Sequence, residues 1–200
     1  MDMKKILKDT TILTVITIIS GMLLGVAFNI TNPIIQDRKL QEKKAAYSAI
    51  FSADTEFVDG SALLEKAPEV LTAAGCTETI TDVLVAQDAS GNVIGYAMRI
   101  STNGFGGELV IAYGYGVDGT SMGIDILTSS ETSGLGSRAS EPEFKDQFAG
   151  KLVEAFSVVK GGAAADTEIN AISGATRTSN AVTGAVNAGI IFGQYCAENN

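Results

Sequence analysis

Apolar residues are concentrated in one uninterrupted stretch near the start of the chain. No charged residue occurs from Thr10 to Gln36, a run of 27 positions. In helical form such a run extends about 40 Å, which exceeds the ~30 Å hydrocarbon core of a bilayer. A cleavable signal peptide has a shorter apolar region that ends at a small-residue site, and Val26-Ala27-Phe28 matches such a site poorly. We therefore expect residues 10–36 to form an uncleaved single-pass anchor in the lipid bilayer.

Beyond this run, the hydrophobic spacing changes along the chain from helical to alternating. Helical spacing continues through residues 34–57 and recurs from Ala62 to Ala74, where Gly75 follows. Alternation with a period of two then predicts two hairpins. Their strands are Ile80–Gln87 and Val93–Ser101 around the turn Asp88–Asn92, and Glu108–Val117 and Met122–Thr128 around Asp118-Gly119.

The C-terminal third combines short elements with one long helix. Early acidic residues and Pro142 predict a short helix from Glu141 to Phe148. Leu152–Lys160 is expected to be a strand, with a helix as the alternative because its flanks are rich in alanine. A terminal helix is predicted from Thr178 to Tyr195, with one apolar face made by Val182, Val186, Ile190 and Ile191. Because helices and strands do not alternate, we expect an α+β fold with a largely antiparallel sheet and flanking helices.

These boundaries divide the chain into three parts with different charges. We expect a tail and anchor in residues 1–36, a helical connector packed on the domain in residues 37–75, and the main domain in residues 76–200. Residues 1–36 hold two acidic and three basic residues, so residues 37–200 hold the other 21 acidic and 11 basic residues, a net charge of −10. This balance argues against a nucleic-acid partner, because nucleic-acid binders carry a basic face.

The charges that flank the apolar run leave its orientation open. Lys4, Lys5 and Lys8 precede the run, but further basic residues follow it at positions 38–44, so the positive-inside count does not decide. The very short N-terminal segment favours an N-terminus inside the cell with the large part of the chain outside.

Histidine and tryptophan are absent, and cysteine occurs only at Cys76 and Cys196. Without histidine the chain has no Ser-His-Asp triad, no His-ligated haem and no HExxH zinc site. Two cysteines do not supply the four thiolates of an iron–sulfur cluster. We therefore expect no metal site, and we assign no catalytic residue.

Three glycine-rich segments carry the candidate chemistry: Asn103–Gly107 (NGFGG), Ser130–Gly136 (SETSGLG) and Ser173–Thr178 (SGATRT). Glycines let the backbone approach a ligand closely. The third segment directly precedes the terminal helix, so its hydroxyls and free N–H groups favour an anion such as phosphate, with Arg177 as a charged donor. The same hydroxyls also suit an ordinary helix cap.

The order GFGG, ETSGLG and SGAT after one apolar N-terminal helix closely resembles the FMN-binding subunit family of RnfG and NqrC, over essentially the whole chain. RnfG belongs to the Rnf ferredoxin:NAD oxidoreductase complex, and NqrC to the sodium-translocating NADH:quinone reductase. The length of 200 residues is closer to RnfG. The resemblance implies an electron-transfer subunit of an ion-translocating Rnf complex in the plasma membrane, with its domain on the extracytoplasmic side. The implied partners are the other subunits of that complex and, for maturation, a flavin transferase.

In this family the transferase joins the FMN phosphate to the last threonine of an Asp-x-x-Ser/Thr-Gly-Ala-Thr motif, as a phosphoester. The matching residue in this chain is Thr176. The resemblance carries the cofactor site onto all three glycine-rich segments. The implied FMN-binding residues are Gly104, Phe105, Gly106, Glu131, Thr132, Gly134, Leu135, Ser173, Gly174, Ala175, Thr176, Arg177 and Thr178.

Three positions depart from the family pattern. Asn170 replaces the aspartate of the motif, Ser133 replaces the proline of ETPGLG, and Ser129 replaces a histidine two positions before the glutamate. Loss of the aspartate charge bears on the transferase reaction and keeps open an anchored binding or scaffold module without flavin. An NqrC-like subunit or another membrane-anchored FMN carrier is a further alternative.

Overall fold

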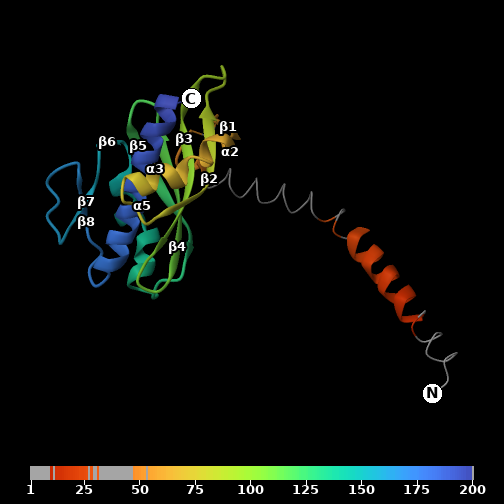
Figure 1. The fold of residues 1–200 in the computed structure, drawn as a ribbon. Helices are drawn as coiled ribbons and strands as arrows, with labels where there is room; N and C mark the ends of the chain where they lie inside the picture. The colour runs from red at the N-terminus through yellow and green to blue at the C-terminus, as the bar shows by residue number, and fades with distance from the viewer. Residues whose placement is uncertain are drawn as a thin grey trace. The chain divides into compact units, whose positions relative to one another are not determined.

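The computed structural model of the chain describes residues 10, 12–26, 28, 31, 47–52 and 54–199 (Figure 1). The chain divides into two compact units, Met1–Lys43 and Lys44–Asn200. Positions 11, 27, 29, 30 and 32–36 of the expected anchor, and positions 37–46 and 53 of the expected connector, lie outside the described residues.

In the first unit, residues 12–26 are helical and expose their apolar side chains. Within the described part of the chain, no helix combines the length and the apolarity that crossing a membrane requires.

The second unit is built on a six-stranded antiparallel sheet whose strands are neighbours in chain order. The strands are β1 (Glu56–Asp59), β2 (Thr79–Gln87), β3 (Val93–Asn103), β4 (Glu108–Gly116), β5 (Thr120–Ser129) and β6 (Lys151–Leu152). Both predicted hairpins are present. Asp88 accepts hydrogen bonds from the N–H groups of Ser90 and Asn92 in the first turn, and Gly119 adopts a φ of +90° in the second. The largely antiparallel sheet of the predicted α+β fold is confirmed.

One face of the sheet is covered by α5 (Thr176–Asn199), with α3 (Ala67–Ala73) beside it (Figure 1). Three residues of the predicted apolar face, Val182, Val186 and Ile190, are buried. Two helical glycines allow close packing, because the rings of Tyr113 and Tyr115 on β4 occupy the space that a Cβ would need at Gly189 and Gly193. The helix therefore lies with its backbone directly against aromatic rings of the sheet.

The opposite face of the sheet carries small residues under two aromatic side chains. Tyr47 and Phe51 are buried there, against alanines at positions 86, 97 and 112. A Cβ at Gly114 would lie only 2.9 Å from Phe51 Cε2. The segment that precedes β1 can lie flat on the sheet because these positions carry little side-chain volume.

Three predicted helices end earlier than expected or are divided. The helix predicted over residues 34–57 is wrong at its C-terminal end, because Glu56–Asp59 pairs with β2 as an edge strand. The helix expected over residues 62–74 divides into α2 (Ser61–Leu64) and α3, since Pro68 starts a new helix at its second position. The helix expected over residues 141–148 is α4 (Pro142–Lys145) followed by the 3₁₀ turn η2 (Asp146–Phe148).

The single strand predicted for Leu152–Lys160 is also wrong, because residues 153–156 do not belong to a strand. The side chain of Phe156 is buried, and its backbone N–H and C=O are both bound by the amide of Asn187 on α5, at 2.8 and 2.9 Å. Beyond this point β7 (Ser157–Val159) pairs in parallel with β8 (Glu168–Asn170), in a separate two-stranded sheet. A tertiary contact with α5 therefore lies within the interruption between the two strands.

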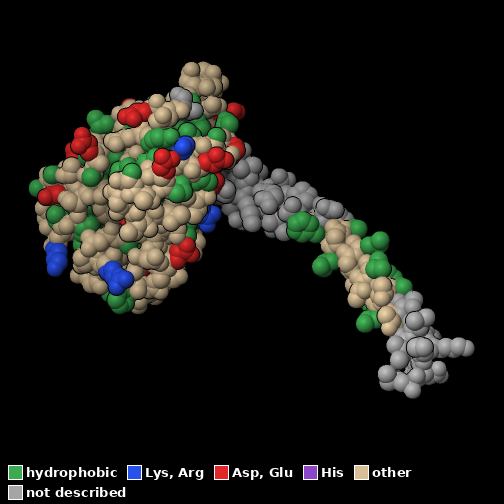
Figure 2. Space-filling model, viewed as in Figure 1, with side chains coloured by type: hydrophobic (Ala, Val, Ile, Leu, Met, Phe, Trp, Pro, Cys, Tyr) green, Lys and Arg blue, Asp and Glu red, His purple; other side chains and the backbone are tan. Residues whose placement is uncertain are grey.

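The acidic excess is visible on the surface of the second unit. Figure 2 shows Asp and Glu side chains scattered over the visible face, with few Lys and Arg side chains among them.

Candidate functional site

The three glycine-rich segments meet around one cavity of about 420 Å³. They come from three separate places: the β3–β4 turn, the loop after β5, and the start of α5. The residues that line the cavity are Phe105, Glu131, Thr132, Leu135, Gly136, Gly174, Ala175, Thr176, Arg177 and Thr178. The fold thus brings together segments that are up to about 70 residues apart in the chain.

Glu131 connects the three segments through its carboxylate. Its Oε1 accepts hydrogen bonds from the N–H groups of Phe105, at 2.7 Å, and Gly106, at 3.2 Å. Its Oε2 accepts a hydrogen bond from the hydroxyl of Thr178 at 2.9 Å. A Cβ at Gly104 or Gly136 would overlap one of these two oxygens. Both glycines therefore leave the space in which the carboxylate lies.

Two large apolar side chains flank the cavity and remain exposed. Phe105 is 69% exposed at the tip of the β3–β4 turn, and Leu135 is 45% exposed on the loop after β5. Leu135 packs against the third segment, since a Cβ at Gly174 would be 3.2 Å from Leu135 Cδ2. Gly134 and Gly174 adopt φ values of +75° and +77°, which side chains other than glycine rarely tolerate. The exposed side chains of Phe105 and Leu135 are suited to contact a flat apolar group.

The third segment ends at the first turn of α5, which starts at Thr176 rather than at the predicted Thr178. The first N–H groups of a helix have no partner within it, and they lie at the positive end of the helix dipole. Arg177 is exposed at the same end, so this side of the cavity is suited to an anion. The carboxylate of Glu131 lines the same cavity and binds the Thr178 hydroxyl in this first turn.

A buried hydroxyl outside the predicted set of site residues holds the third segment in place. Ser179 is fully buried, its Oγ donates to the C=O of Ala175 at 3.0 Å, and it accepts from the N–H of Ile172 at 2.9 Å. The segment immediately before Thr176 is thereby bound to the first turn of the helix. Sequence position is the one available signal, because a serine four residues after Ala175 can reach back to that carbonyl.

Nine of the thirteen residues expected to bind the cofactor line this cavity, and four do not. Gly104, Gly106 and Gly134 shape the loops without lining the cavity. Ser173 lines a second cavity of about 440 Å³ on the other side of the motif segment.

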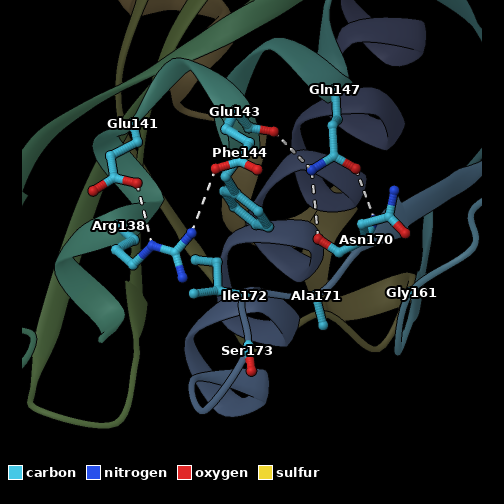
Figure 3. Close-up of a pocket in the computed structure, with 10 residues that line it drawn as sticks. All are labelled: Arg138, Glu141, Glu143, Phe144, Gln147, Gly161, Asn170, Ala171, Ile172 and Ser173. Atoms are coloured by element: carbon cyan, nitrogen blue, oxygen red, sulfur yellow. Dashed lines mark hydrogen bonds and ion pairs between the residues drawn. The ribbon is translucent and has the colours of Figure 1, made fainter. Parts of the chain in front are cut away.

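The second cavity is shown in Figure 3. Arg138 lies between Glu141 and Glu143 and pairs with both, at 3.2 and 3.4 Å. The side-chain amide of Gln147 binds the backbone of Asn170 on both sides, accepting from its N–H at 2.7 Å and donating to its C=O at 3.4 Å. This cavity therefore lies beside the residue that replaces the aspartate of the motif.

The side chain of Asn170 has a structural contact of its own. Its Oδ1 accepts a hydrogen bond from the N–H of Ala163 at 3.0 Å, which fixes the loop between β7 and β8. A carboxylate oxygen would accept the same bond. At this contact, asparagine and aspartate are equivalent.

Comparison with known proteins gives a consistent family. Residues 104–191 match the FMN-binding domain family. The G-subunit of the Na⁺-translocating ferredoxin:NAD⁺ oxidoreductase complex of Acetobacterium woodii is 34% identical to this chain, over 94% of this chain and 92% of that protein. The G-subunit of the ion-translocating oxidoreductase complex of Methanosarcina acetivorans is 31% identical over 96% of each chain.

Among solved structures, the crystal structure of Shewanella oneidensis NqrC superposes with a TM-score of 0.52 at 24% identity, and the match covers 58% of each chain. This likeness concerns the fold. The sequence identity of 31–34% over nearly the whole of both chains assigns the family: the chain belongs to the RnfG family of ion-translocating oxidoreductase complexes, with the FMN-binding domain that this family shares with NqrC.

Proposed function

We propose that the chain is the FMN-carrying subunit of an ion-translocating ferredoxin:NAD⁺ oxidoreductase complex, with FMN bound through a phosphoester to Thr176. The cofactor supplies electron transfer, and the protein positions it and adjusts its electronic environment. The Acetobacterium woodii relative is a subunit of such a complex, the Methanosarcina acetivorans relative is a subunit of an ion-translocating oxidoreductase complex, and residues 104–191 match an FMN-binding domain. In this proposal the chain is one carrier in a series of subunits and no stand-alone enzyme.

The residues around the cavity suit FMN in kind and in arrangement. A phosphate would lie at the α5 N-terminus near Arg177, where unpaired N–H groups and a guanidinium favour an anion. The apolar side chains of Phe105 and Leu135 would contact the flat ring system. A volume of about 420 Å³ lies within the range of small-molecule sites.

One observation carries the covalent part of the proposal: the two threonines at the start of α5 differ in accessibility. Thr178 is fully buried and donates its hydroxyl to Glu131. Thr176 is half-buried at the cavity, and its hydroxyl has no hydrogen-bond partner within residues 47–52 and 54–199. A second enzyme can therefore reach the Thr176 oxygen but not the Thr178 oxygen.

The attachment step balances as a transfer from an activated phosphate. The Oγ–P bond of Thr176 forms while the P–O bond of a phosphoanhydride of FMN breaks. The hydroxyl proton passes to a base of the transferase, and the other half of the anhydride leaves as a phosphate. This chain contributes the nucleophilic hydroxyl and the N–H groups that hold the phosphate.

The test is to express the full chain with a flavin transferase and to examine it on a denaturing gel. We expect a fluorescent band and an intact mass that exceeds the polypeptide mass by FMN minus water. A dark band with the mass of the bare polypeptide would contradict the proposal and favour the binding or scaffold module without flavin. A fluorescent chain that co-purifies with subunits of an NADH:quinone reductase would instead favour the NqrC-like alternative.

Asn170→Asp, which restores the aspartate of the motif, should leave flavin loading at the wild-type level. Either side chain offers the oxygen that binds the Ala163 N–H, so the loop geometry is retained. Fluorescence per mole of protein after co-expression with the transferase measures the effect, with Asn170→Leu as the variant that loses the bond. A several-fold rise in loading for Asn170→Asp would show that the transferase reads the charge itself.

We further propose that the domain of residues 76–200 lies on the extracytoplasmic side of the plasma membrane, joined through residues 37–75 to a bilayer anchor in residues 10–36. The charge-free run of 27 residues supports the anchor. Protease added to intact cells from outside should degrade residues 37–200. Complete protection in intact cells, with cleavage after lysis, would contradict this topology.

A further inference from the structure

Glu131 has a different role from the other polar residues of the cavity, because both of its oxygens are already used by the protein. Oε1 accepts from two backbone N–H groups of the β3–β4 turn, and Oε2 accepts from the Thr178 hydroxyl of α5. Glu131 itself follows β5. One carboxylate therefore binds both the β3–β4 turn and the first turn of α5 to the loop after β5.

We propose, on the basis of the function proposed above, that Glu131 is a positioning residue that assembles the flavin pocket and that its charge lowers the reduction potential of the bound flavin. The residue lines the cavity and is bonded both to the turn that carries Phe105, the proposed ring contact, and to Thr178 in the first turn of α5. It acts on the cofactor through the loops it joins and through its electric field, and not through a bond to the flavin.

The positioning part follows from how few other contacts hold the β3–β4 turn. The turn has one internal backbone bond, from the Gly104 N–H to the Gly107 C=O at 2.8 Å. The two N–H groups at its tip, those of Phe105 and Gly106, both bind Glu131. Charge-assisted bonds of this kind are stronger than bonds between neutral groups. Without the carboxylate, the tip of the turn would lose both of its hydrogen bonds to Glu131, and the Phe105 backbone would be held less firmly.

The electrostatic part follows from the same geometry. Each electron that the flavin accepts adds negative charge to the cavity unless a proton accompanies it. A fixed carboxylate beside the ring disfavours that added charge, and the effect is larger in a partly buried site than in water. Because Glu131 is held by three donors, it is not free to turn away when the charge appears.

Two variants of the full chain separate these effects. In Glu131→Gln, the amide oxygen can accept from the two N–H groups and the amide nitrogen can donate to Thr178 Oγ1, so the contacts are kept and the charge is removed. In Glu131→Ala, both are lost. The matched control is Glu108→Gln, which removes an exposed carboxylate near the same turn. The Glu108 carboxylate accepts a hydrogen bond from Ser101 at 2.6 Å and does not line the cavity.

The first measurement is amide hydrogen exchange of the chain without flavin. We expect the Phe105 and Gly106 amides to exchange about tenfold or more faster in Glu131→Ala, and at the wild-type rate in Glu131→Gln and Glu108→Gln. Unchanged exchange in Glu131→Ala would overturn the positioning role. This arm needs no cofactor, so it remains decisive if the wild-type chain carries no flavin and the proposed function fails.

The second measurement is a reductive titration of the flavin-loaded chain against a reference dye. The midpoint potential should be more positive in Glu131→Gln than in the wild type, and the shift should exceed that of Glu108→Gln. Equal shifts in the two variants, or a shift to lower potential in Glu131→Gln, would overturn the electrostatic role. A purely structural role would leave the potential of Glu131→Gln unchanged, because that variant retains the contacts.

Discussion

Thr176→Ala should abolish covalently attached flavin completely while leaving the fold intact. The substitution removes the accessible hydroxyl at the start of α5, and Thr178 offers no substitute because its oxygen is buried against Glu131. Alanine is well tolerated in the first turn of a helix, so no loss of stability should accompany the loss of flavin. The measurement is in-gel fluorescence together with intact mass, after co-expression with the transferase.

Two matched variants make the result specific to Thr176. Thr176→Ser keeps a hydroxyl at the same place and should retain the fluorescent band. Ser173→Ala removes a neighbouring hydroxyl that lines the other cavity, and it should also retain the band. A bright band in Thr176→Ala would move the attachment to another residue, and peptide mapping of that band would identify it.

Gly189→Ala should strongly destabilise the fold through a single added methyl group in α5. A Cβ at this position would overlap Cδ1 of the fully buried Tyr113 ring and would come within 2.9 Å of Ile100 Cδ1. Neither side chain has an open direction in which to move, because both lie in the main core. We expect a loss of about 1–3 kcal/mol in the free energy of unfolding, which is typical of overpacked cores.

The control for this prediction lies one and a half turns earlier on the same helix. A Cβ at Gly184 would meet only Glu78 Oε1, at 2.8 Å, which is the end of a flexible side chain. Gly184→Ala should therefore be neutral, or stabilising by up to about 1 kcal/mol, since alanine favours helix over glycine. Denaturant unfolding of the full chain measures both variants. Equal stability of Gly189→Ala and Gly184→Ala would contradict the packing argument.

Cys196 offers an independent probe of the same unfolding. Its side chain is fully buried on α5, and burial raises the pKa of the thiol to about 12. Because the thiolate is the reactive form, alkylation at pH 8 should require opening of the fold and should be faster in Gly189→Ala.

The parts of the fold that sequence predicts well are those fixed by local chemistry. The hairpin around Asp88 follows from a side chain that binds its own turn, and the one around Gly119 from a residue that adopts positive φ. The terminal helix follows from an apolar face with helical spacing. The single strand expected over Leu152–Lys160 fails because the Phe156 backbone binds the amide of Asn187, about 30 residues away, instead of a neighbouring strand. The residues within 152–160 contain no pattern from which that contact could be predicted.

The candidate site divides in the same way. Glycine content and order indicate which three segments matter, and the resemblance attaches a cofactor to them. The joining of Phe105 and Thr178 through one carboxylate depends on how β3, β4 and β5 pair, and it is therefore visible only in the folded chain. Ser179 and Gln147 are of the same kind, since each binds backbone groups whose position is set by tertiary packing.

The amide of Gln147 has a consequence for how this protein behaves among its neighbours. β8 has β7 on one side, and on the other side it would present the unpaired N–H and C=O of Asn170. Such an open strand edge is a template on which another polypeptide can add a strand, and it is a frequent start of aggregation. Gln147 satisfies both groups with a single side chain and so occupies the place of the next strand. The segment that leads into the flavin motif is thereby protected from pairing with other chains, without the need for a further strand.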